Sequence, residues 1–460
     1  MRLQMNPGWK KHRVLIIGIA RQGVALARYL AAQGADVTLN DQRDAEQLSA
    51  TRQALADLPI AWALGGHPLS LLDGIETVCV SGGVPLTLPI IQEAQRRGLH
   101  LTNDTQVFLD SVPCKVIGIT GSAGKTTTTT LVGRMAQALH PHPVWVGGNI
   151  GQPLVERLDE IQHRHLVILE LSSFQLELVT LSPQVSAVLN ITPNHLDRHG
   201  TMQAYTAAKA RILDFQTPAD IAILNQQDPG SAALAERVRG RCLWFGMQRP
   251  PAGQAGCFFA DGKICHTDGQ TEQALFDQEK ILLRGAHNLL NVLAACTIAL
   301  AAGLPGEGLV QGVENFGGVP HRLELVRSLR GVRWYNDSIA TAPERTIAAI
   351  RSFNEPLILL LGGRDKNLPW DDLAEIVRQR ACKVLIFGES GEKIFAALQQ
   401  AGFTGTILHT EKLQAAVQAA ARLAETGEVV LLSPGGTSFD EFVDFEQRGE
   451  RFRQWVKEIQ

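Results

Sequence analysis

The chain has few of the features that would tie it to an oxidising compartment, a membrane or nucleic acid. Its 460 residues include only seven cysteines, and no two of these form a Cys-x-x-Cys pair, which argues against a disulfide framework or a zinc ribbon. No apolar run approaches the ~20 residues that a membrane-spanning helix needs. Lysine and arginine number 43 against 46 acidic residues, and they are scattered, so no basic face suggests nucleic acid. We therefore expect a cytoplasmic protein that neither enters a membrane nor binds nucleic acid.

The N-terminus has only a superficial likeness to a secretory signal. Lys10, Lys11 and Arg13 precede the apolar residues 14–17, but this run is short and no small-residue cleavage site follows it. It is better interpreted as a first β-strand. A hydrophobic content of 45% with 19% charged residues is typical of a globular chain, and the length allows about three domains at ~150 residues each.

The first segment predicts a Rossmann-like βαβ unit. Residues 13–41 show a strand, a turn from Gly18 to Gly23, a helical pattern and a second strand that ends near Asp41, where a Rossmann fold places its ribose ligand. The turn lacks the central glycine of the dinucleotide fingerprint, so NAD is only weakly indicated. A different nucleotide, or no ligand, stays open.

The remaining segments alternate strand-like and helical patterns, which predicts further α/β domains. Their apolar runs lie at 166–170, 185–189, 221–224, 357–361, 383–387 and 429–432. We expect a central parallel domain of the P-loop ATPase type and a C-terminal Rossmann-like, doubly wound domain with ligand loops at its strand ends. Pro113 and the Gly-Gly-Val-Pro sequence at 317–320 mark the joins. The predicted domains are 1–113, 114–318 and 319–460.

The most informative stretch, residues 120–126, reads Thr-Gly-Ser-Ala-Gly-Lys-Thr and lies between an apolar run and a helical pattern. A strand, a glycine turn and a helix start hold phosphates through backbone N–H groups, while Lys125 supplies a charge and Thr126 can ligate Mg²⁺. A strict P-loop has glycine where Ile119 stands, and a chance Gly-Lys-Thr in a loop is the alternative. The flanking elements favour phosphate binding, with a nucleoside triphosphate as the ligand.

Three further positions are candidates for chemistry. Glu170 ends a buried strand pattern, where a carboxylate either binds a metal or, as the alternative, reaches water. His195 and His199 would share a helix face at a spacing that can bind zinc, but no third ligand is evident, so a loop histidine that contacts Mg²⁺ or a carboxylate substrate is preferred. Lys209 lies in a helical stretch, where composition alone favours an exposed lysine.

Several motifs in one order give the chain a resemblance to the Mur ligase family, and they cover essentially its whole length. They are the Thr-Gly-x-x-Gly-Lys-Thr loop at 120–126, the segments 169–177 and 194–199, Gly-Ala-His-Asn at 285–288, Pro-His-Arg-Leu-Glu at 320–324, Tyr-Asn-Asp-Ser at 335–338, and 432–449 with its Phe-Glu-Gln-Arg-Gly. The set is similar to that of the glutamate-adding members. Folylpolyglutamate synthetases share the phosphate loop but should lack the first domain and the Phe-Glu-Gln-Arg-Gly close.

The resemblance implies an ATP-dependent, monomeric ligase of cytoplasmic peptidoglycan precursor synthesis. It would join D-glutamate to UDP-N-acetylmuramoyl-L-alanine through an acyl phosphate. The implied catalytic residues are Lys125, His195, Lys209 and Arg322, with Lys209 carbamylated, and the implied Mg²⁺ ligands are Thr126, Glu170, His195 and Lys209. The implied ATP contacts are Gly121, Ser122, Ala123, Gly124, Lys125, Thr126, Thr127, Asn288, Arg322 and Asp337. The implied contacts are Gly18, Asp41, Arg43, Ser81, Gly83 and Asn149 for the UDP-sugar, and Thr341, Lys366, Ser438 and Phe445 for glutamate.

One position departs from the family pattern. The usual Asp-Ser-Lys-Ala-Thr-Asn-Pro reads Asp-Ser-Ile-Ala-Thr-Ala-Pro at 337–343, so Ile339 stands where a cation is expected and cannot carry its charge. Either another cation such as Arg364 compensates, or the pocket holds glutamate differently, as it would for L-glutamate. D-glutamate stays the first choice because the other glutamate positions match. More remote alternatives are a P-loop switch protein and a nicotinamide oxidoreductase.

Overall fold

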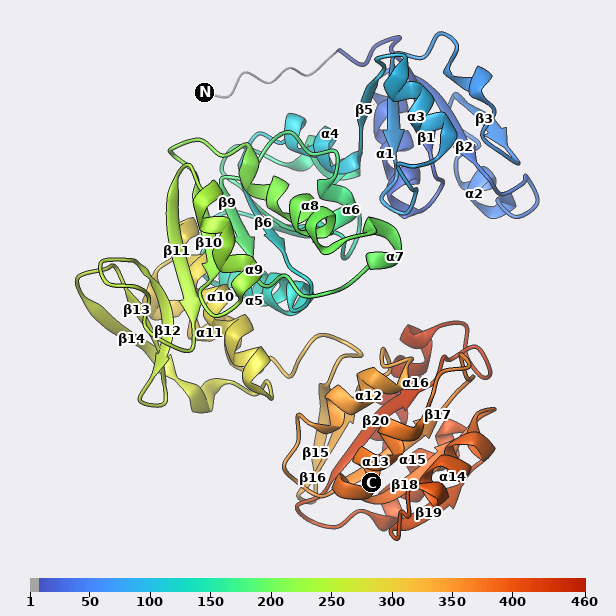
Figure 1. The fold of residues 1–460 in the computed structure, drawn as a ribbon, viewed down its shortest axis with the longest axis vertical. Coiled ribbons are helices and arrows are strands. Elements are labelled where there is room, and N and C mark those ends of the chain that lie inside the picture. The colour runs from blue at the N-terminus through green and yellow to red at the C-terminus, as the bar shows by residue number, and fades with distance from the viewer. Residues whose placement is uncertain (1–7) are drawn as a thin grey trace. The chain divides into compact units, whose positions relative to one another are not determined.

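The computed structural model describes residues 8–460, which form three separate β-sheets with helices packed on them (Figure 1). This confirms the prediction of three α/β domains. By packing, the described chain divides into two compact units. Residues 8–280 with Leu290–Glu314 form the first unit, and Ile281–Leu289 with Asn315–Gln460 form the second.

The N-terminal sheet is parallel throughout, with the strand order β3-β2-β1-β4-β5. Its strands are β1 (Arg13–Ile17), β2 (Asp36–Asp41), β3 (Ile60–Leu64), β4 (Thr77–Val80) and β5 (His100–Thr102). Its helices are α1 (Arg21–Ala32), α2 (Ser49–Ala54), α3 (Pro89–Arg96) and α4 (Asp104–Ser111), with a 3₁₀ turn η1 (Leu69–Leu72). Alternate residues of β1 feed two cores. Val14 and Ile16 pack in the core that contains α1, and Leu15 and Ile17 pack in the core that contains α3, so both faces are covered, as a parallel sheet requires.

The central sheet has the order β14-β13-β12-β11-β10-β9-β6-β8-β7. Its strands are β6 (Lys115–Thr120), β7 (Val144–Gly148), β8 (Leu166–Glu170), β9 (Val185–Val188), β10 (Ile221–Asn225), β11 (Arg241–Gly246), β12 (Gly256–Ala260), β13 (Lys263–Thr267) and β14 (Glu272–Asp277). The helices of this part of the chain are α5 (Lys125–Leu139), α6 (Ser173–Leu176), α7 (Leu196–His199), α8 (Met202–Asp214), α9 (Pro229–Ala232), α10 (Ala286–Ala302) and α11 (Val310–Val313), with 3₁₀ turns η2 (Leu154–Glu160), η3 (Ala233–Arg237), η4 (Gln278–Lys280) and η5 (Gly306–Gly308).

The expectation of an entirely parallel central domain is wrong at one edge. Strands β12, β13 and β14 pair antiparallel. Asp261 and Gly262 join β12 to β13 and both have positive φ, at 50° and 73°, which is the backbone of a two-residue type I′ hairpin turn. The Asp-Gly pair was the available sequence signal for this hairpin.

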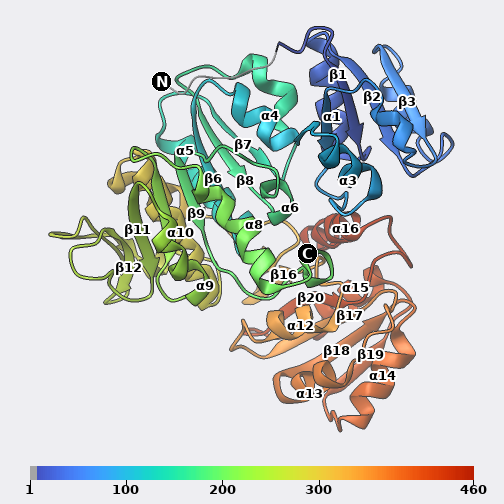
Figure 2. The ribbon, with the colours of Figure 1, turned by 45° about the horizontal axis from the view of Figure 1, so that its top comes forward.

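The C-terminal sheet has the order β15-β16-β20-β17-β18-β19, and only its edge strand β15 runs antiparallel. Figure 2 shows its strands β16, β20, β17, β18 and β19. Its strands are β15 (Glu324–Leu329), β16 (Val332–Asn336), β17 (Leu357–Gly362), β18 (Ala381–Phe387), β19 (Thr406–His409) and β20 (Val429–Gly435). Its helices are α12 (Pro343–Ile350), α13 (Asp371–Arg380), α14 (Gly391–Gln400), α15 (Leu413–Leu423) and α16 (Phe445–Glu458). Alternate residues of β17 feed two cores, one shared with α12, α13 and α14 and the other with α15 and α16. This is a doubly wound arrangement.

Two global properties follow from the described part of the chain. All seven cysteines are free thiols. Within residues 8–460 no helix combines the length and the apolar character that crossing a bilayer demands.

Candidate active site

The predicted phosphate loop lies between β6 and α5, which confirms the strand, turn and helix read from the sequence. Gly124 is the N-cap of α5 with a φ of 82°, and a Cβ there would lie 2.3 Å from the Asn291 Oδ1 atom. Only glycine fits this position. No side chain caps the helix, so the first N–H groups of α5 are left to a ligand, and a helix N-terminus favours an anionic one.

Two lysine ammonium groups meet at this loop. Lys125 Nζ donates to the Gly121 carbonyl at 2.8 Å, and Lys209 Nζ, from α8, donates to the same oxygen at 2.9 Å. Lys209 is only 1% exposed, so the interpretation of an exposed lysine is wrong. Burial, followed by the charge of Lys125, lowers the pKa of Lys209 to about 7. A neutral amine is therefore available near neutral pH, and only the neutral form is a nucleophile.

Glu170 ends β8 beside the loop and is fully buried, at 1% exposure. Its Oε1 atom accepts a hydrogen bond from Asn149 Nδ2 at 2.8 Å, whereas its Oε2 atom has no hydrogen-bond partner in the protein. The alternative of a strand-end carboxylate that reaches water is thereby wrong. A buried carboxylate oxygen without a donor suits a cation.

The residues fit Mg²⁺ better than a metal with an all-protein cage. Among residues 8–460 no group of three or more His, Cys, Asp or Glu side chains could hold a metal ion. Mg²⁺ is commonly held by one or two protein carboxylates together with waters and substrate phosphates. Glu170, Thr126 and a carboxylated Lys209 would supply oxygen ligands of this kind.

His195 and His199 do not share a helix face, which corrects the expectation from their spacing. His195 precedes α7 in a left-handed conformation with a φ of 52°, and His199 ends that helix. Their rings contact Phe174, His195 edge-on at 5.1 Å and His199 stacked at 5.2 Å. His199 Nε2 is hydrogen-bonded to Ser173 Oγ at 2.9 Å, so a shared zinc ion is disfavoured. Burial lowers the pKa of His195, which keeps its imidazole neutral near pH 7.

Sequence reasoning did not identify the part played by Tyr205. This residue of α8 is buried, and its ring lies 4.8 Å from Lys209 Nζ. Its hydroxyl is 3.0 Å from Ser122 Oγ in the phosphate loop. The tyrosine therefore positions the lysine and the loop together, and its spacing of four from Lys209 on a helix was the only signal in the sequence.

The predicted UDP-sugar residues of the N-terminal sheet are close together. Gly18, with a φ of 96°, leaves no room for a side chain because a Cβ would lie 2.6 Å from Val84 Cγ2, and Ser81 Oγ donates to the Gly18 carbonyl at 2.7 Å. Asp41 accepts from the Ile19 backbone N–H at 2.8 Å and from the Arg43 guanidinium at 2.8 and 3.0 Å. These hydrogen bonds hold the pKa of Asp41 well below its usual range.

Two arginines connect the predicted UDP-sugar residues to the predicted metal-site residues within the first unit, and the sequence reasoning missed both. Arg21 Nη2 donates to the Asn149 carbonyl at 3.3 Å. Arg198, one turn after His195, donates to the carbonyls of Gly83 at 3.2 Å and Val84 at 2.5 Å and covers the Phe174 ring at 4.9 Å. No local sequence pattern links residue 198 to residue 83, so only the fold could reveal this contact.

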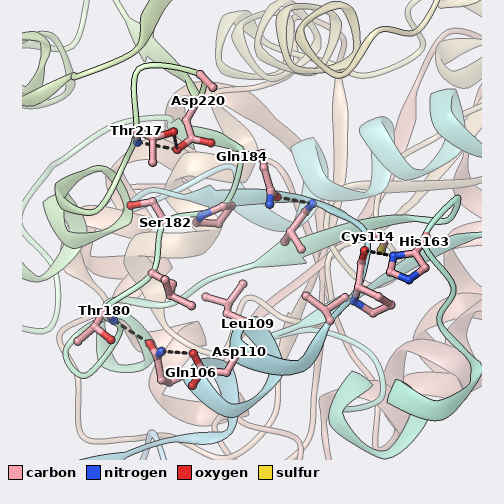
Figure 3. A pocket seen from close by; sticks show the side chains of 16 residues that line it. Gln106, Leu109, Asp110, Cys114, His163, Thr180, Ser182, Gln184, Thr217 and Asp220 are labelled. Carbon is pink, nitrogen blue, oxygen red and sulfur yellow. Dashed lines mark hydrogen bonds between the residues drawn. The ribbon is translucent and has the colours of Figure 1, made fainter. Parts of the chain in front are cut away.

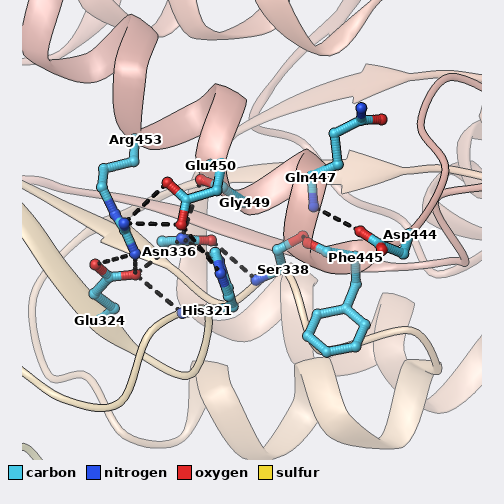
Figure 4. A network of polar contacts seen from close by, with 10 residues as sticks. All are labelled: His321, Glu324, Asn336, Ser338, Asp444, Phe445, Gln447, Gly449, Glu450 and Arg453. Carbon is cyan, nitrogen blue, oxygen red and sulfur yellow. Dashed lines mark hydrogen bonds and ion pairs between the residues drawn. The ribbon is translucent and has the colours of Figure 1, made fainter. Parts of the chain in front are cut away.

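The predicted glutamate residues all belong to the second unit. Lys366 Nζ donates to Thr341 Oγ1 at 3.2 Å, and Ser438 is 2% exposed. Phe445 begins α16 and contacts the His321 ring edge-on at 6.2 Å. Figure 4 shows Phe445 and Ser338 beside a network in which Arg453 pairs with Glu324 and Glu450 around His321.

The predicted ATP residues are divided between the two units. The phosphate loop lies in the first unit, whereas Asn288, Arg322 and Asp337 lie in the second. Asp337 is 5% exposed and accepts from Ser433 Oγ at 2.8 Å and from the Leu323 N–H at 3.2 Å. Burial raises the pKa of Asp337 to about 7, and the charges of Arg322 and Arg345 act against that rise.

A separate pocket of about 810 Å³ lies away from these residues (Figure 3). It is lined by α4 and by the segments that precede β6, β8, β9 and β10, with polar side chains that include Asp110, His163 and Asp220. None of the predicted site residues lines it. In parallel α/β sheets ligands bind beyond the carboxyl ends of the strands, and this pocket faces the amino ends.

Comparison with known proteins agrees with the arrangement of the three sheets. Three family models match: "Mur ligase MurD-like, N-terminal domain" at residues 12–103, "Mur ligase middle domain" at 119–299 and "Mur ligase, glutamate ligase domain" at 321–436. The chain is 39% identical over 449 residues to a UDP-N-acetylmuramoylalanine--D-glutamate ligase of Symbiobacterium thermophilum, covering 98% of each chain. It is also 39% identical over 447 residues to the protein of that name from Geobacter metallireducens, covering 97% of each.

Solved structures support the same fold at lower identity. The UDP-N-acetylmuramate-alanine ligase MurC of Thermotoga maritima superimposes with a TM-score of 0.57 at 18% identity, covering 97% of this chain and 100% of that one. MurF of Acinetobacter baumannii gives a TM-score of 0.57 at 19% identity, covering 97% of this chain and 92% of the other. With family models over all three sheets and relatives at 39% identity along nearly the full length, the chain belongs to the Mur ligase family.

Proposed function

We propose that the protein is an ATP-dependent ligase that joins D-glutamate to UDP-N-acetylmuramoyl-L-alanine, a step in the synthesis of peptidoglycan precursors. One observation carries the proposal. Lys125 and Lys209 meet at the Gly121 carbonyl of a phosphate loop, next to the buried Glu170 with its unpartnered oxygen. Relatives 39% identical along nearly the whole chain carry the name of this reaction, which supports the choice of substrates.

The first step would transfer a phosphoryl group. The γ-phosphoryl group of ATP passes to an oxygen of the alanine carboxylate, which gives ADP and an acyl phosphate. The N–H groups at the start of α5 face the phosphates, and Lys125 exchanges the Gly121 carbonyl for a phosphate oxygen. Asn288, Arg322 and Asp337 are proposed to contact the nucleotide from the second unit. Phosphoryl transfer gains most from such fixed positive charge.

Mg²⁺ is proposed as the metal, because Glu170 offers an unpartnered carboxylate oxygen in a buried site. When bound, the ion would neutralise charge on the phosphoryl oxygens. Thr126 and Glu170 would hold it, together with His195 and with Lys209 once its neutral amine has added carbon dioxide and released a proton to give a carbamate. Tyr205 holds Lys209 in place through its ring.

The second step would form the amide. The neutral amine of glutamate attacks the acyl carbon, phosphate leaves with the former carboxylate oxygen, and the amine loses a proton. Gly18, Asp41, Arg43, Ser81, Gly83 and Asn149 are proposed to hold the UDP-sugar, which the contact of Asn149 with Glu170 supports. Thr341, Lys366, Ser438 and Phe445 are proposed to hold glutamate, since a lysine beside a hydroxyl suits a carboxylate.

The proposal extends to compartment, oligomeric state and domain limits. Free thiols at all seven cysteines support a reducing compartment and hence the cytoplasm. We propose a monomer with domains at 1–113, 114–318 and 319–460, which the three separate sheets support.

Product analysis tests the proposal. Purified protein is incubated with ATP, Mg²⁺, UDP-N-acetylmuramoyl-L-alanine and either D- or L-glutamate, and the products are separated and weighed by mass spectrometry. The expected product is the D-glutamyl amide, formed faster than its L-isomer. Faster formation with L-glutamate would show that the enzyme prefers this enantiomer, and the comparison matters because Ile339 stands where the family has a lysine. Absence of both amides would refute the proposed function.

A further inference from the structure

The turn at Ile339 and Thr341 lacks a charge of its own but is firmly held in place. It connects β16 to α12. The Ile339 N–H donates to the His321 carbonyl at 3.1 Å, and the Thr341 N–H donates to the Ile339 carbonyl at 2.9 Å. The N–H of Gly435, the last residue of β20, donates to the Ala340 carbonyl at 2.9 Å. The segment that contains His321 and the end of β20 are therefore both hydrogen-bonded to this turn.

Two cationic side chains from different elements contact the turn. Lys366 Nζ donates to Thr341 Oγ1 at 3.2 Å, and Arg345 Nη1, from the first turn of α12, lies 3.5 Å from the Ile339 carbonyl. Arg345 is exposed. Within residues 8–460, no carboxylate lies in ion-pair range of either cation. Asp337 lies near enough for the charge of Arg345 to lower its pKa, but this carboxyl is buried and already accepts from Ser433 Oγ and the Leu323 N–H. Neither cation at the turn is therefore closed off by an ion pair, which leaves room for two negative charges.

The other nearby cations are already engaged. Arg364, which the sequence suggested as a substitute for the missing lysine, is paired with both oxygens of Glu389 at 2.8 and 3.0 Å. Arg448 is fully buried, and among residues 8–460 it donates only to Ser338 and Gly436. A bidentate pair uses the planar fork of the guanidinium. Neither arginine is as available to a ligand as Arg345.

We propose that Arg345 is a specificity-determining residue that binds one carboxylate of glutamate while Lys366 binds the other. This rests on the proposed function. A dicarboxylate amino acid brings two negative charges, and the turn presents two cations that form no ion pair within residues 8–460. Arg345 thus supplies, from α12, the charge that Ile339 lacks. Its long side chain and planar guanidinium suit a bidentate grip on a carboxylate.

The expected effect is selective for glutamate. Loss of a charge-assisted hydrogen bond should raise the KM for glutamate in Arg345→Met by about ten- to a hundredfold. The KM for ATP and for the UDP-sugar should change by less than about threefold. Arg345→Lys should lie between the wild type and Arg345→Met, because it keeps the charge and loses the fork.

The experiment compares Arg345→Met with Arg351→Met. Arg351 lies at the C-terminal end of the same helix and is exposed, so it controls for net charge and for helix stability. The second readout is rescue: Ile339→Lys, introduced into Arg345→Met, should restore a cation at the turn and lower the KM for glutamate again.

The outcomes separate this inference from the proposed function. Wild-type protein that forms no glutamyl amide refutes the proposed function. Wild-type protein that is active, with an unchanged KM for glutamate in Arg345→Met, overturns only the inference about Arg345. Equal rises in the KM for glutamate and for ATP, without rescue by Ile339→Lys, would likewise overturn it, because that pattern indicates a structural role.

Discussion

Arg448 offers a severe test of how the C-terminal loops are held. Its guanidinium is 0% exposed. Nε donates to Ser338 Oγ at 3.0 Å, Nη2 donates to the Ser338 carbonyl at 2.8 Å, and both Nη atoms donate to the Gly436 carbonyl at 3.1 and 3.2 Å. The side chain thereby joins the turn that follows β16 to the loop that follows β20. Substitution by methionine removes these contacts and keeps most of the volume.

Two opposing effects set the change in local stability that Arg448→Met should cause. Burial lowers the pKa of Arg448 to about 10, a penalty of about 3 kcal/mol on the charged form that methionine would remove. Methionine also leaves three buried acceptors on Ser338 and Gly436 without a donor, at about 1–3 kcal/mol each. The summed cost of the three unsatisfied acceptors exceeds the desolvation penalty that is removed. Arg448→Met should therefore lower the local stability by about 3 kcal/mol.

Hydrogen exchange followed by mass spectrometry measures the stability of the segments around Arg448, which avoids assigning one free energy of unfolding to a multidomain chain. Peptides that cover α16 and the turn at Ser338 should exchange faster by the corresponding factor of about 10². Arg451→Met is the matched control, because Arg451 lies on the same helix, is exposed and contacts only Gln454 among the described residues. A change below about 0.5 kcal/mol, or an equal change in the control, would refute the reasoning.

Four further predictions concern the proposed sites. Lys125→Ala should lose more than nine-tenths of turnover with its circular dichroism unchanged, because the side chain faces phosphate; a rate above about a tenth of wild type would contradict a contribution of several kcal/mol. Lys209→Ala should be equally inactive, and small carboxylic acids should partly restore its turnover; unaltered activity would show that no carbamate is needed. Asp41→Ala should weaken UDP-sugar binding in calorimetry, while wild-type protein binds no NAD(H); equal affinity in the variant would remove Asp41 from the crevice. Asp337 has a folded pKa of about 7 against 3.8 in the unfolded chain, so the folded state binds the proton more tightly, and hydrogen exchange of peptides around Asp337, corrected for the intrinsic pH dependence of exchange, should show local stability falling by up to about 4 kcal/mol as pH rises from about 4 to about 7. Asp337→Asn should flatten this pH profile, and a slope identical to that of wild type would disprove the linkage.

The local part of the site could be predicted from the sequence. The phosphate loop, Glu170 at a strand end and the βαβ unit with Asp41 all depend on patterns within about 30 residues, and the structure has each of these elements where the pattern placed it. Periodicity and turn residues report on neighbours along the chain. The antiparallel strands after β11 had a local signal in Asp261 and Gly262 as well, and reading it would have corrected the expectation of a wholly parallel sheet.

The rest depends on contacts between distant segments. A helical pattern could not tell whether Lys209 faces solvent or the Gly121 carbonyl, 88 positions away. The contact of Arg198 with Gly83, 115 positions away, likewise requires the fold. The left-handed backbone of His195 is a further case, since its spacing from His199 suggested a shared helix face that the structure does not have.

The most direct test of the central claim is phosphate release by the wild-type protein as a function of its two acceptor substrates. With ATP and Mg²⁺ present, UDP-N-acetylmuramoyl-L-alanine and D-glutamate are supplied singly and together, and phosphate and amide are both quantified. The account predicts sustained phosphate release only when both are present, with one amide formed for each phosphate. Phosphate release at the same rate when either substrate is omitted would contradict it, because the site would then be hydrolysing nucleotide without ligation.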